Sequence, residues 1–364
     1  MDMAKTFKPN TILLWQKVAE HPEAQRILRL FPSAQIHLIE QQRKPPLINM
    51  PPGQALLAGK RTLMIGQTLS FVGRFDGQLG PTVQCCPYYK LVPISNGCPY
   101  YCTYCYLAYV YRKFAPFIKI NINYNTMFKQ IRKILGCSSG KISFNMGEML
   151  DSLALDHITN LTKMLNPFFS RFSNAYLMLL TKSSNINNLL TVEPNNHTVV
   201  SWSLNSRYAI SKYELGTASL EERIKAAELC QNHGYRIRFR IDPGILHTDW
   251  QAGYAELIQK ALTVTRPENI TLGMLRLLPG HFHLARDAYG NRARKLCDHN
   301  FIKGASDGKL RYPPKQRIEF YTFLINVIRS FDKNVSISLC REKPEIWDVF
   351  KQRCELKKCN CLVW

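Results

Sequence analysis

From residue 91 the chain alternates short apolar runs with helix-patterned segments, and this order constrains the fold more than any other feature. The apolar runs predict strands at residues 91–95, 141–146, 175–180, 198–203, 235–241 and 270–278, with a possible seventh at 335–339. The clearest helix follows the fourth run, where Ser219 and Glu222 form a capping box and Gly234 supplies a stop. Strands and helices that alternate at this spacing predict an α/β fold, a partial or complete (β/α) barrel of six to seven units.

The predicted barrel divides the chain into three parts. Residues 1–90 are less regular and include a proline-rich turn at 44–53, so we interpret them as an N-terminal cap or small subdomain. Residues 91–340 form the predicted barrel, and residues 341–364 form a C-terminal tail that contains cysteines. Because barrel enzymes carry their chemistry at the C-terminal ends of the strands, we expect the functional site there.

The charge balance of the chain indicates the kind of partner that it binds. Lys and Arg number 48 against 26 Asp and Glu, so the formal charge is +22, which favours a polyanion such as DNA over a generically basic surface. No signal-length apolar run opens the chain and none approaches about 18 residues, so we expect a cytoplasmic protein with no membrane partner. In that reducing compartment the 12 cysteines are expected to be metal ligands or buried side chains.

Three of these cysteines follow the first predicted strand. Cys98, Cys102 and Cys105 have the spacing C-x3-C-x2-C. Three thiolates that hold a [4Fe-4S] cluster leave one iron without a protein ligand, and that iron can bind a small molecule. A structural zinc site needs a fourth ligand, and the loop offers no other Cys or His within about ten residues. An open iron–sulfur cluster is therefore favoured over a zinc loop or a group of core thiols.

This spacing, with an aromatic residue before the last cysteine, resembles that of radical S-adenosylmethionine enzymes. Seven further segments resemble the spore photoproduct lyase family: GCPYYCTYCYL, GEMLDSLALDH, LLTKSSNINNLL, VVSWSLN, LGTASLEERIKAA, DGKLRYP and SLCREKPEIW. The resemblance covers most of the chain from about residue 90. It implies a DNA repair lyase that reverses the thymine cross-link called spore photoproduct. It also implies a [4Fe-4S] cluster, S-adenosylmethionine and a low-potential electron donor such as flavodoxin or ferredoxin.

The resemblance assigns cofactor ligands by position. It implies that Cys98, Cys102 and Cys105 bind the cluster. It also implies that Lys182 and Ser203 lie near the adenosylmethionine.

The resemblance assigns two further pairs of residues. Tyr104 and Tyr106 match tyrosines of the family's hydrogen-atom relay. Arg311 and Tyr312 match a hairpin that contacts the lesion in DNA, and the Asp307-Gly308 pair favours a tight turn on physical grounds.

The chain departs from the family after the second strand. The family has a cysteine there that returns a hydrogen atom to the product, whereas this chain has Glu148. Gly147 and Glu148 resemble the GGE element of other radical enzymes, in which a carboxylate accepts hydrogen bonds from the cofactor's ammonium; a helix-capping carboxylate is the alternative. Cys137 precedes the strand, so it is expected near the opposite end of the barrel.

Glu148 therefore leaves the substrate open. The leading hypothesis is repair of a thymine lesion in DNA. The alternative is a radical enzyme with the same cofactors and a different substrate, either RNA or not a nucleic acid. A third hypothesis is a zinc protein that binds nucleic acid without catalysis.

Four cysteines near the C-terminus suggest a second metal site. Cys354, Cys359 and Cys361 are close in sequence, and Cys340 lies a short helix upstream. Four thiols are suited to a second iron–sulfur cluster or a zinc ion. A basic tail with incidental cysteines is the alternative.

Three arginines alternate along the fifth predicted strand. Arg236, Arg238 and Arg240 share one face of it. If that face lines the barrel, they form an anion-binding wall; if it points outward, they are ordinary surface arginines. Asp242 follows at the strand end and is a candidate site residue by position alone.

Overall fold

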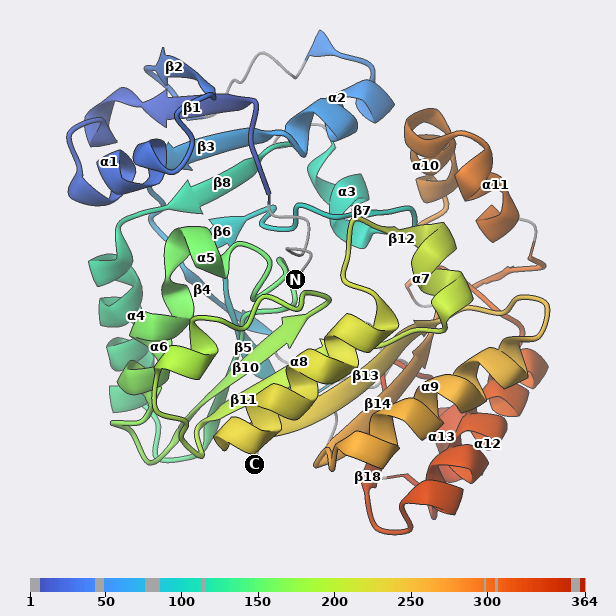
Figure 1. The fold of residues 1–364 in the computed structure, drawn as a ribbon. Helices are drawn as coiled ribbons and strands as arrows, with labels where there is room; N and C mark the ends of the chain where they lie inside the picture. The colour runs from blue at the N-terminus through green and yellow to red at the C-terminus, as the bar shows by residue number, and fades with distance from the viewer. Residues whose placement is uncertain are drawn as a thin grey trace.

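The computed structural model describes residues 7–42, 49–75, 86–112, 116–297, 299–304, 307–354 and 361–363. Two main sheets build the molecule, a large one that carries most of the helices and a smaller N-terminal one above it (Figure 1). No helix in the described ranges is both long and apolar enough to cross a membrane.

The large sheet has the strand order β18-β14-β13-β11-β10-β9-β5-β4. Its strands, in chain order, are β4 (Val72–Phe75), β5 (Tyr88–Leu91), β9 (Ile142–Asn145), β10 (Ala175–Thr181), β11 (Thr198–Ser203), β13 (Arg236–Gly244), β14 (Asn269–Met274) and β18 (Ser336–Leu339). The seven strands from β5 to β18 pair in parallel, and β4 pairs antiparallel with β5. Since β18 and β4 are its two edges, the described sheet is open, and the predicted α/β architecture is confirmed as a partial barrel.

Two predicted strands are wrong in their boundaries. The run 91–95 is divided, because β5 ends at Leu91 and β6 (Ile94–Ser95) belongs to the other sheet. Pro93 lies between them and has no N–H to continue a ladder. The run 270–278 is likewise divided into β14 and β15 (Arg276–Leu277), which pairs with β17 (Leu310–Arg311) in a small three-stranded sheet completed by β16 (Ile302–Lys303).

Helices cover the outer face of the large sheet, as Figure 1 shows. They include α4 (Tyr124–Gly136), α5 (Asp156–Thr159), α6 (Leu161–Phe169), α8 (Leu220–His233), α9 (Trp250–Val264), α12 (Pro314–Phe331) and α13 (Pro344–Phe350). The predicted capping box of α8 is confirmed, and Gly234 ends the helix with a φ of 110°. Leu220, Ile224 and Ala227 follow a helical period and are buried, so α8 packs its apolar face inward.

The N-terminal sheet has the order β2-β1-β3-β8-β6. Its further strands are β1 (Thr11–Trp15), β2 (Gln35–Ile39), β3 (Thr62–Gly66) and β8 (Ile118–Asn121), and α1 (Pro22–Arg29) and α2 (Pro52–Gly59) connect them. Because β6 and β8 come from beyond residue 90, this sheet includes part of the chain predicted as barrel. The three-part division itself stays a prediction.

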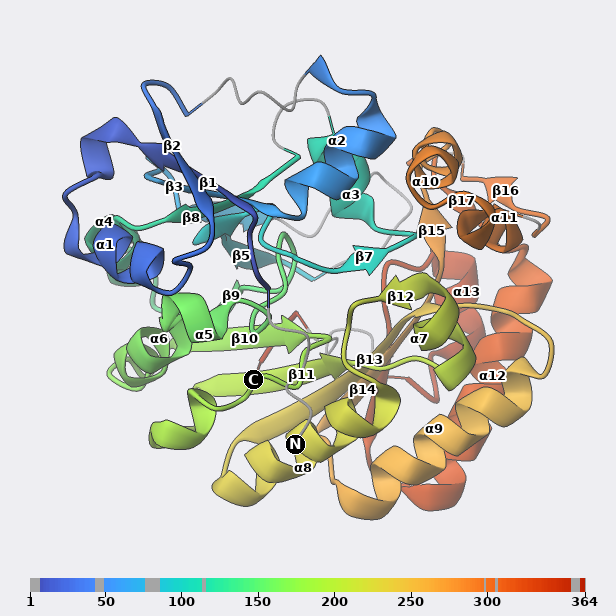
Figure 2. The same cartoon turned by 45° about the horizontal axis from the view of Figure 1, so that its top comes forward.

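The remaining elements are short. They are β7 (Tyr101–Cys102), α3 (Tyr106–Tyr111), α7 (Arg207–Tyr213), β12 (Glu214–Leu215), α10 (His281–Tyr289) and α11 (Asn291–Cys297), with 3-10 turns at Gln16–Val18 and Leu189–Thr191. Strands β7 and β12 pair antiparallel. Figure 2 shows this pair between the N-terminal sheet and the large sheet.

The end of the described chain lies against the inner face of the large sheet. Ser143 Oγ donates to the Cys361 carbonyl at 2.8 Å, and Arg236 Nη2 donates to the Val363 carbonyl at 2.8 Å. Arg238 donates to the Leu362 carbonyl and to Glu268. The three alternating arginines therefore face inward, yet two of them bind the tail, and Arg240 alone of the three reaches the cavity described next.

Candidate functional site

A cavity of about 250 Å³ lies at the C-terminal ends of β9, β10, β11 and β13. Its lining includes the following residues that the sequence singled out: Cys98, Cys102, Tyr104, Cys105, Tyr106, Gly147, Glu148, Lys182, Ser203, Arg240 and Asp242. These residues come from strand ends and loops far apart in the chain. Parallel pairing brings the residues at the ends of β9, β10, β11 and β13 to one edge of the sheet, and the pair of β7 and β12 holds the cysteine loop beside them.

The cysteine loop is held on both sides by hydrogen bonds. Cys102 lies in β7, which pairs with β12, and Cys105 is the residue before α3. Thr103 N donates to the Tyr213 carbonyl at 2.9 Å, and Lys60 Nζ donates to the Cys98 carbonyl. The loop is therefore fixed between the N-terminal region and the large sheet.

The three thiols line one wall of the cavity and affect one another electrostatically. Burial, together with Cys105, raises the pKa of Cys98 to about 12, although the Lys60 ammonium opposes the shift. Burial also raises the pKa of Cys102 well above its usual value. No three His, Cys, Asp or Glu side chains in the described ranges converge closely enough to hold one ion. Three soft donors on one cavity wall nevertheless fit an iron–sulfur cluster, whose charge would stabilise the thiolates.

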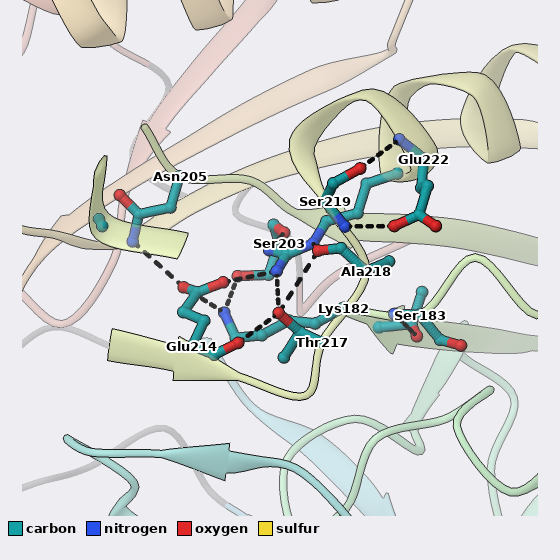
Figure 3. Close-up of polar contacts among 12 residues, drawn as sticks. Lys182, Ser183, Ser203, Asn205, Glu214, Thr217, Ala218, Ser219 and Glu222 are labelled. Atoms are coloured by element: carbon teal, nitrogen blue, oxygen red, sulfur yellow. Dashed lines mark hydrogen bonds and ion pairs between the residues drawn. The ribbon is translucent and has the colours of Figure 1, made fainter. Parts of the chain in front are cut away.

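A buried carboxylate, Glu214, binds several polar side chains next to the cysteine loop (Figure 3). Lys182 Nζ lies 3.2 Å from Glu214 Oε1, and Arg223 Nη2 lies 2.7 Å from Oε2. Tyr104 donates its hydroxyl to Glu214, and Asn205 Nδ2 donates at 3.2 Å. Burial alone would raise the pKa of Glu214, but Lys182 and Arg223 lower it to about 2.

Sequence reasoning missed Glu214. Its only signal is its position just before the LGTASLEERIKAA segment. The structure shows that it connects Tyr104 with Lys182, and thus joins the cysteine loop to the residues expected near the adenosylmethionine.

Lys182 and Ser203, at the ends of β10 and β11, lie in contact. Lys182 Nζ donates to Ser203 Oγ at 2.6 Å. Asp151 accepts from the Lys182 N–H at 2.7 Å and from the Thr181 hydroxyl at 2.6 Å. Asp151 therefore fixes the backbone at Lys182, and Ser203 Oγ fixes the position of the Lys182 ammonium in the cavity.

Asp242 lies between two arginines of the cavity lining. We call the group of charged lining residues to which it belongs the far wall: Glu148, Arg240, Asp242, Arg276, Lys309 and Arg341. Arg240 Nη2 donates to Asp242 Oδ2 at 2.7 Å, and Arg276 Nη2 donates to both Asp242 oxygens at 2.8 Å. Burial would raise the pKa of Asp242, but the two guanidinium groups hold it well below its usual range. Asp242 is thus an ionised partner of the arginines.

Glu148 also lies on the far wall, and Arg341 pairs with it. Burial would raise the pKa of Glu148, but Arg341 and Arg240 lower it below its usual value. Arg341 has a φ of 52°, which is uncommon for a residue other than glycine. The ion pair joins the loop after β9 to the residues just after β18, two regions far apart along the open sheet.

Gly147 allows the loop after β9 to approach β10 closely. A Cβ atom at this position would lie 2.2 Å from Leu180 Cβ. We therefore expect Gly147→Ala to lower the free energy of unfolding by about 1–3 kcal/mol, since the packed strand must shift. Urea unfolding measures this. Gly136→Ala is the control, because nothing lies within 4 Å of its added Cβ. Equal stability of the two variants would contradict the expected clash.

The hairpin residues predicted to contact DNA lie outside the cavity lining. Arg311 is buried and its Nη1 donates to Asp307 Oδ1 at 2.7 Å. Tyr312 is fully buried, and its hydroxyl accepts from the Leu246 N–H at 3.2 Å. Lys309, two residues before Arg311, lines the cavity. A DNA contact by Arg311 or Tyr312 stays a prediction.

The C-terminal cysteines do not assemble among the described residues. Cys340 accepts a hydrogen bond from Arg240 Nη2 at 3.0 Å, and burial raises its pKa to about 11. Cys354 packs in the main core, whereas Cys361 packs with Cys86 and Tyr88. Cys359 lies outside the described residues. The second metal site stays a prediction.

Comparison with known proteins finds one family repeatedly. A family model described as spore photoproduct lyase matches residues 7–307. A spore photoproduct lyase of Geobacillus sp. (strain Y412MC61) is 26% identical over 308 residues, which cover 83% of this chain and 85% of that protein. One of Clostridium acetobutylicum is 29% identical over 255 residues, covering 69% and 73%.

Solved structures agree in fold. A spore photoproduct lyase complexed with dinucleoside spore photoproduct has a TM-score of 0.77 and 23% identity, and the alignment covers 91% of this chain and 98% of that one. A cysteine-to-alanine mutant with the same ligand has a TM-score of 0.79 and 22% identity, with the same coverage. At this identity the likeness shows the shared fold.

Proposed function

The chain belongs to the spore photoproduct lyase family and is a radical S-adenosylmethionine lyase, and from this membership we propose that it reverses a thymine cross-link in DNA. The observation that carries the proposal is the cavity, whose lining combines the cysteine triad, the Lys182–Ser203 pair, Tyr104 and Tyr106. The charge of +22 supports a nucleic-acid substrate. Relatives of this fold have been solved with dinucleoside spore photoproduct.

We assign the cofactors to the cysteine wall. Cys98, Cys102 and Cys105 would hold a [4Fe-4S] cluster, and Lys182 with Ser203 would bind the methionine carboxylate of S-adenosylmethionine. When bound, these cofactors supply a 5′-deoxyadenosyl radical after one electron arrives from a donor such as flavodoxin or ferredoxin. The protein's own part is to orient the nucleoside and to keep water out.

The hydrogen atom that the product radical regains must come from a residue other than Glu148. One hydrogen atom leaves the lesion, the bond between the two thymines breaks, and the product radical must regain one hydrogen atom. Glu148 is an ionised carboxylate paired with Arg341, so it has no hydrogen atom to give. We assign this transfer to Tyr106, which is 48% exposed and lines the cavity. The tyrosyl radical then recovers its hydrogen from 5′-deoxyadenosine, so the atoms balance.

Glu148 also favours a second candidate function, radical chemistry on a different substrate. An ion pair at the position where the family has a thiol makes that part of the cavity more polar. A polar wall of this kind favours a substrate that carries a charged or polar group next to Glu148 and Arg341.

An anaerobic reaction distinguishes the two functions. Reconstituted, dithionite-reduced protein is given S-adenosylmethionine and DNA that carries spore photoproduct, and 5′-deoxyadenosine and thymine are quantified. We expect both products. Cofactor cleavage without thymine recovery would contradict lesion repair and favour the second candidate. A Glu148→Cys variant provides the comparison: a gain in thymine recovery over the parent protein would show that the missing thiol limits the reaction.

A further inference from the structure

The far wall of the cavity carries more positive than negative charge. Its lining contains Arg240, Arg276, Lys309 and Arg341 as cations and Asp242 and Glu148 as carboxylates. Asp242 is shared by Arg240 and Arg276, and Glu148 pairs with Arg341. Each carboxylate is therefore already engaged, and the wall retains an excess of positive charge.

Lys309 is the cation of this wall that lacks a carboxylate. No Asp or Glu of the described ranges lies within ion-pair distance of its ammonium. The Nζ atom lies over the ring of Tyr106, 5.3 Å from the ring centroid. Burial, Arg341 and Arg276 lower the pKa of Lys309 to about 8. A partly buried ammonium beside two guanidinium groups favours an anion from outside the protein.

The hairpin holds Lys309 in this place. Gly304 N donates to the Lys309 carbonyl at 2.7 Å, and Asp307 Oδ1 accepts from the Lys309 N–H at 3.2 Å. The same Asp307 carboxylate binds Arg311, with Arg311 Nη1 donating at 2.7 Å. Asp307 is thus occupied in fixing the turn, while the Lys309 side chain extends into the cavity.

The two lysines of the cavity lining have different neighbours. Lys182 contacts Ser203 and Glu214, and its charge acts on the Cys102 thiol. Lys309 Nζ lies 5.3 Å from the centroid of the Tyr106 ring, and Arg341 and Arg276 lower its pKa, whereas Asp307 raises it. A cofactor bound beside Lys182 would therefore leave Lys309 to another ligand.

We propose that Lys309, supported by Arg341 and Arg276, binds the phosphodiester that bridges the two nucleosides of the lesion. This inference rests on the proposed function. It adds that the far wall recognises one group of the substrate, the bridging phosphodiester. A bridging phosphodiester carries a single negative charge, which one ammonium can balance. A phosphodiester is also the anion that a chain of charge +22 most readily attracts when its substrate is DNA.

The test compares two forms of the lesion that differ only in this phosphate. Dinucleoside spore photoproduct lacks the bridging phosphate, and the dinucleotide form contains it. Anaerobic calorimetry of the reconstituted holoprotein measures both Kd values. We expect the dinucleotide to bind about tenfold more tightly, as for one charge-assisted hydrogen bond. Lys309→Met should remove this preference and Lys309→Arg should retain it.

Lys303→Met is the matched control. Lys303 lies on β16 of the same hairpin, is exposed and is not part of the cavity lining, so its loss should leave the preference unchanged. Equal binding of both lesion forms by the parent protein, or an undiminished preference in Lys309→Met, would overturn the phosphate assignment and leave the proposed function in place. Failure of the parent protein to bind either form would overturn both.

Discussion

Replacing Cys102 with alanine should abolish the brown iron–sulfur chromophore and lower S-adenosylmethionine cleavage by at least about 100-fold. Loss of one ligand leaves two thiols on the cavity wall, too few to hold a cluster that already lacks a fourth protein ligand. The fold should persist, because Cys102 is a small side chain whose replacement removes a single buried atom. Anaerobic reconstitution followed by iron and sulfide analysis, visible absorbance and 5′-deoxyadenosine yield gives the measurement.

Cys137→Ala is the control for this experiment. Cys137 is exposed, directly after α4 and away from the cavity lining. The variant should keep the iron content, colour and activity of the parent protein. If the Cys102→Ala protein kept a full complement of iron and sulfide, the cluster would have to lie elsewhere. Stoichiometric zinc in a colourless parent protein would likewise exclude the assigned chemistry.

Glu214→Gln should lower the free energy of unfolding by about 3–5 kcal/mol, because it removes the counter-charge of the buried Arg223 and the partly buried Lys182. Lys182 and Arg223 both contact this carboxylate, and the Arg223 and Glu214 side chains have no exposed surface. The change should also weaken S-adenosylmethionine binding, since Lys182 loses a contact that helps to direct its ammonium. Urea unfolding of the apoprotein and calorimetry of the holoprotein measure the two effects separately.

The stabilisation by Glu214 should depend on pH in one direction. The pKa of Glu214 is lowered from 4.5 to about 2 in the folded protein. A lowered carboxyl pKa stabilises the folded state above the unfolded-state pKa, and this contribution is lost as the pH falls. The difference between the parent protein and Glu214→Gln should therefore be complete above about pH 5 and shrink toward pH 2.

Glu221→Gln provides a matched comparison at the surface. Glu221 pairs with Arg207, and the two side chains are 47% and 51% exposed. Water screens this pair, so we expect a loss of no more than about 1 kcal/mol. A similarly small effect of Glu214→Gln would mean that the buried network contributes little and that Lys182 finds its position by other contacts.

Much of the large sheet was predictable from local pattern. The runs at 141–146, 175–180, 198–203, 235–241 and 335–339 each coincide with or overlap a strand of the large sheet, because short runs of apolar and β-branched residues favour strands that are buried on both faces. The boundaries at 91–95 and 270–278 were wrong. The hydrophobicity of a continuous run does not reveal that its first part ends one strand and that its second part belongs to a strand of another sheet.

The cavity was predictable to the extent that its residues follow strands. Lys182 and Ser203 lie at or just after the ends of β10 and β11, and parallel pairing brings such positions together. The triad reaches the same cavity from a loop that the antiparallel pair of β7 and β12 holds in place. Glu214, Lys309 and Arg341 were missed because they follow no such rule. Lys309 and Arg341 reach the cavity from the loops after β16 and β18, whereas Glu214, in the short strand β12, contacts the lining residues Tyr104 and Lys182. The importance of each depends on which charges surround it.

The sequence by itself determined the order of the parallel strands of the large sheet, the spacing of the three cysteines and the family, because these depend on neighbouring residues along the chain. Only the tertiary structure decided which charges meet. It paired Glu148 with Arg341, placed Glu214 between Lys182 and Arg223, and directed Lys309 rather than Arg311 into the cavity. Electrostatic partners are chosen by distances of a few ångströms between segments far apart in sequence, and no local pattern encodes those distances.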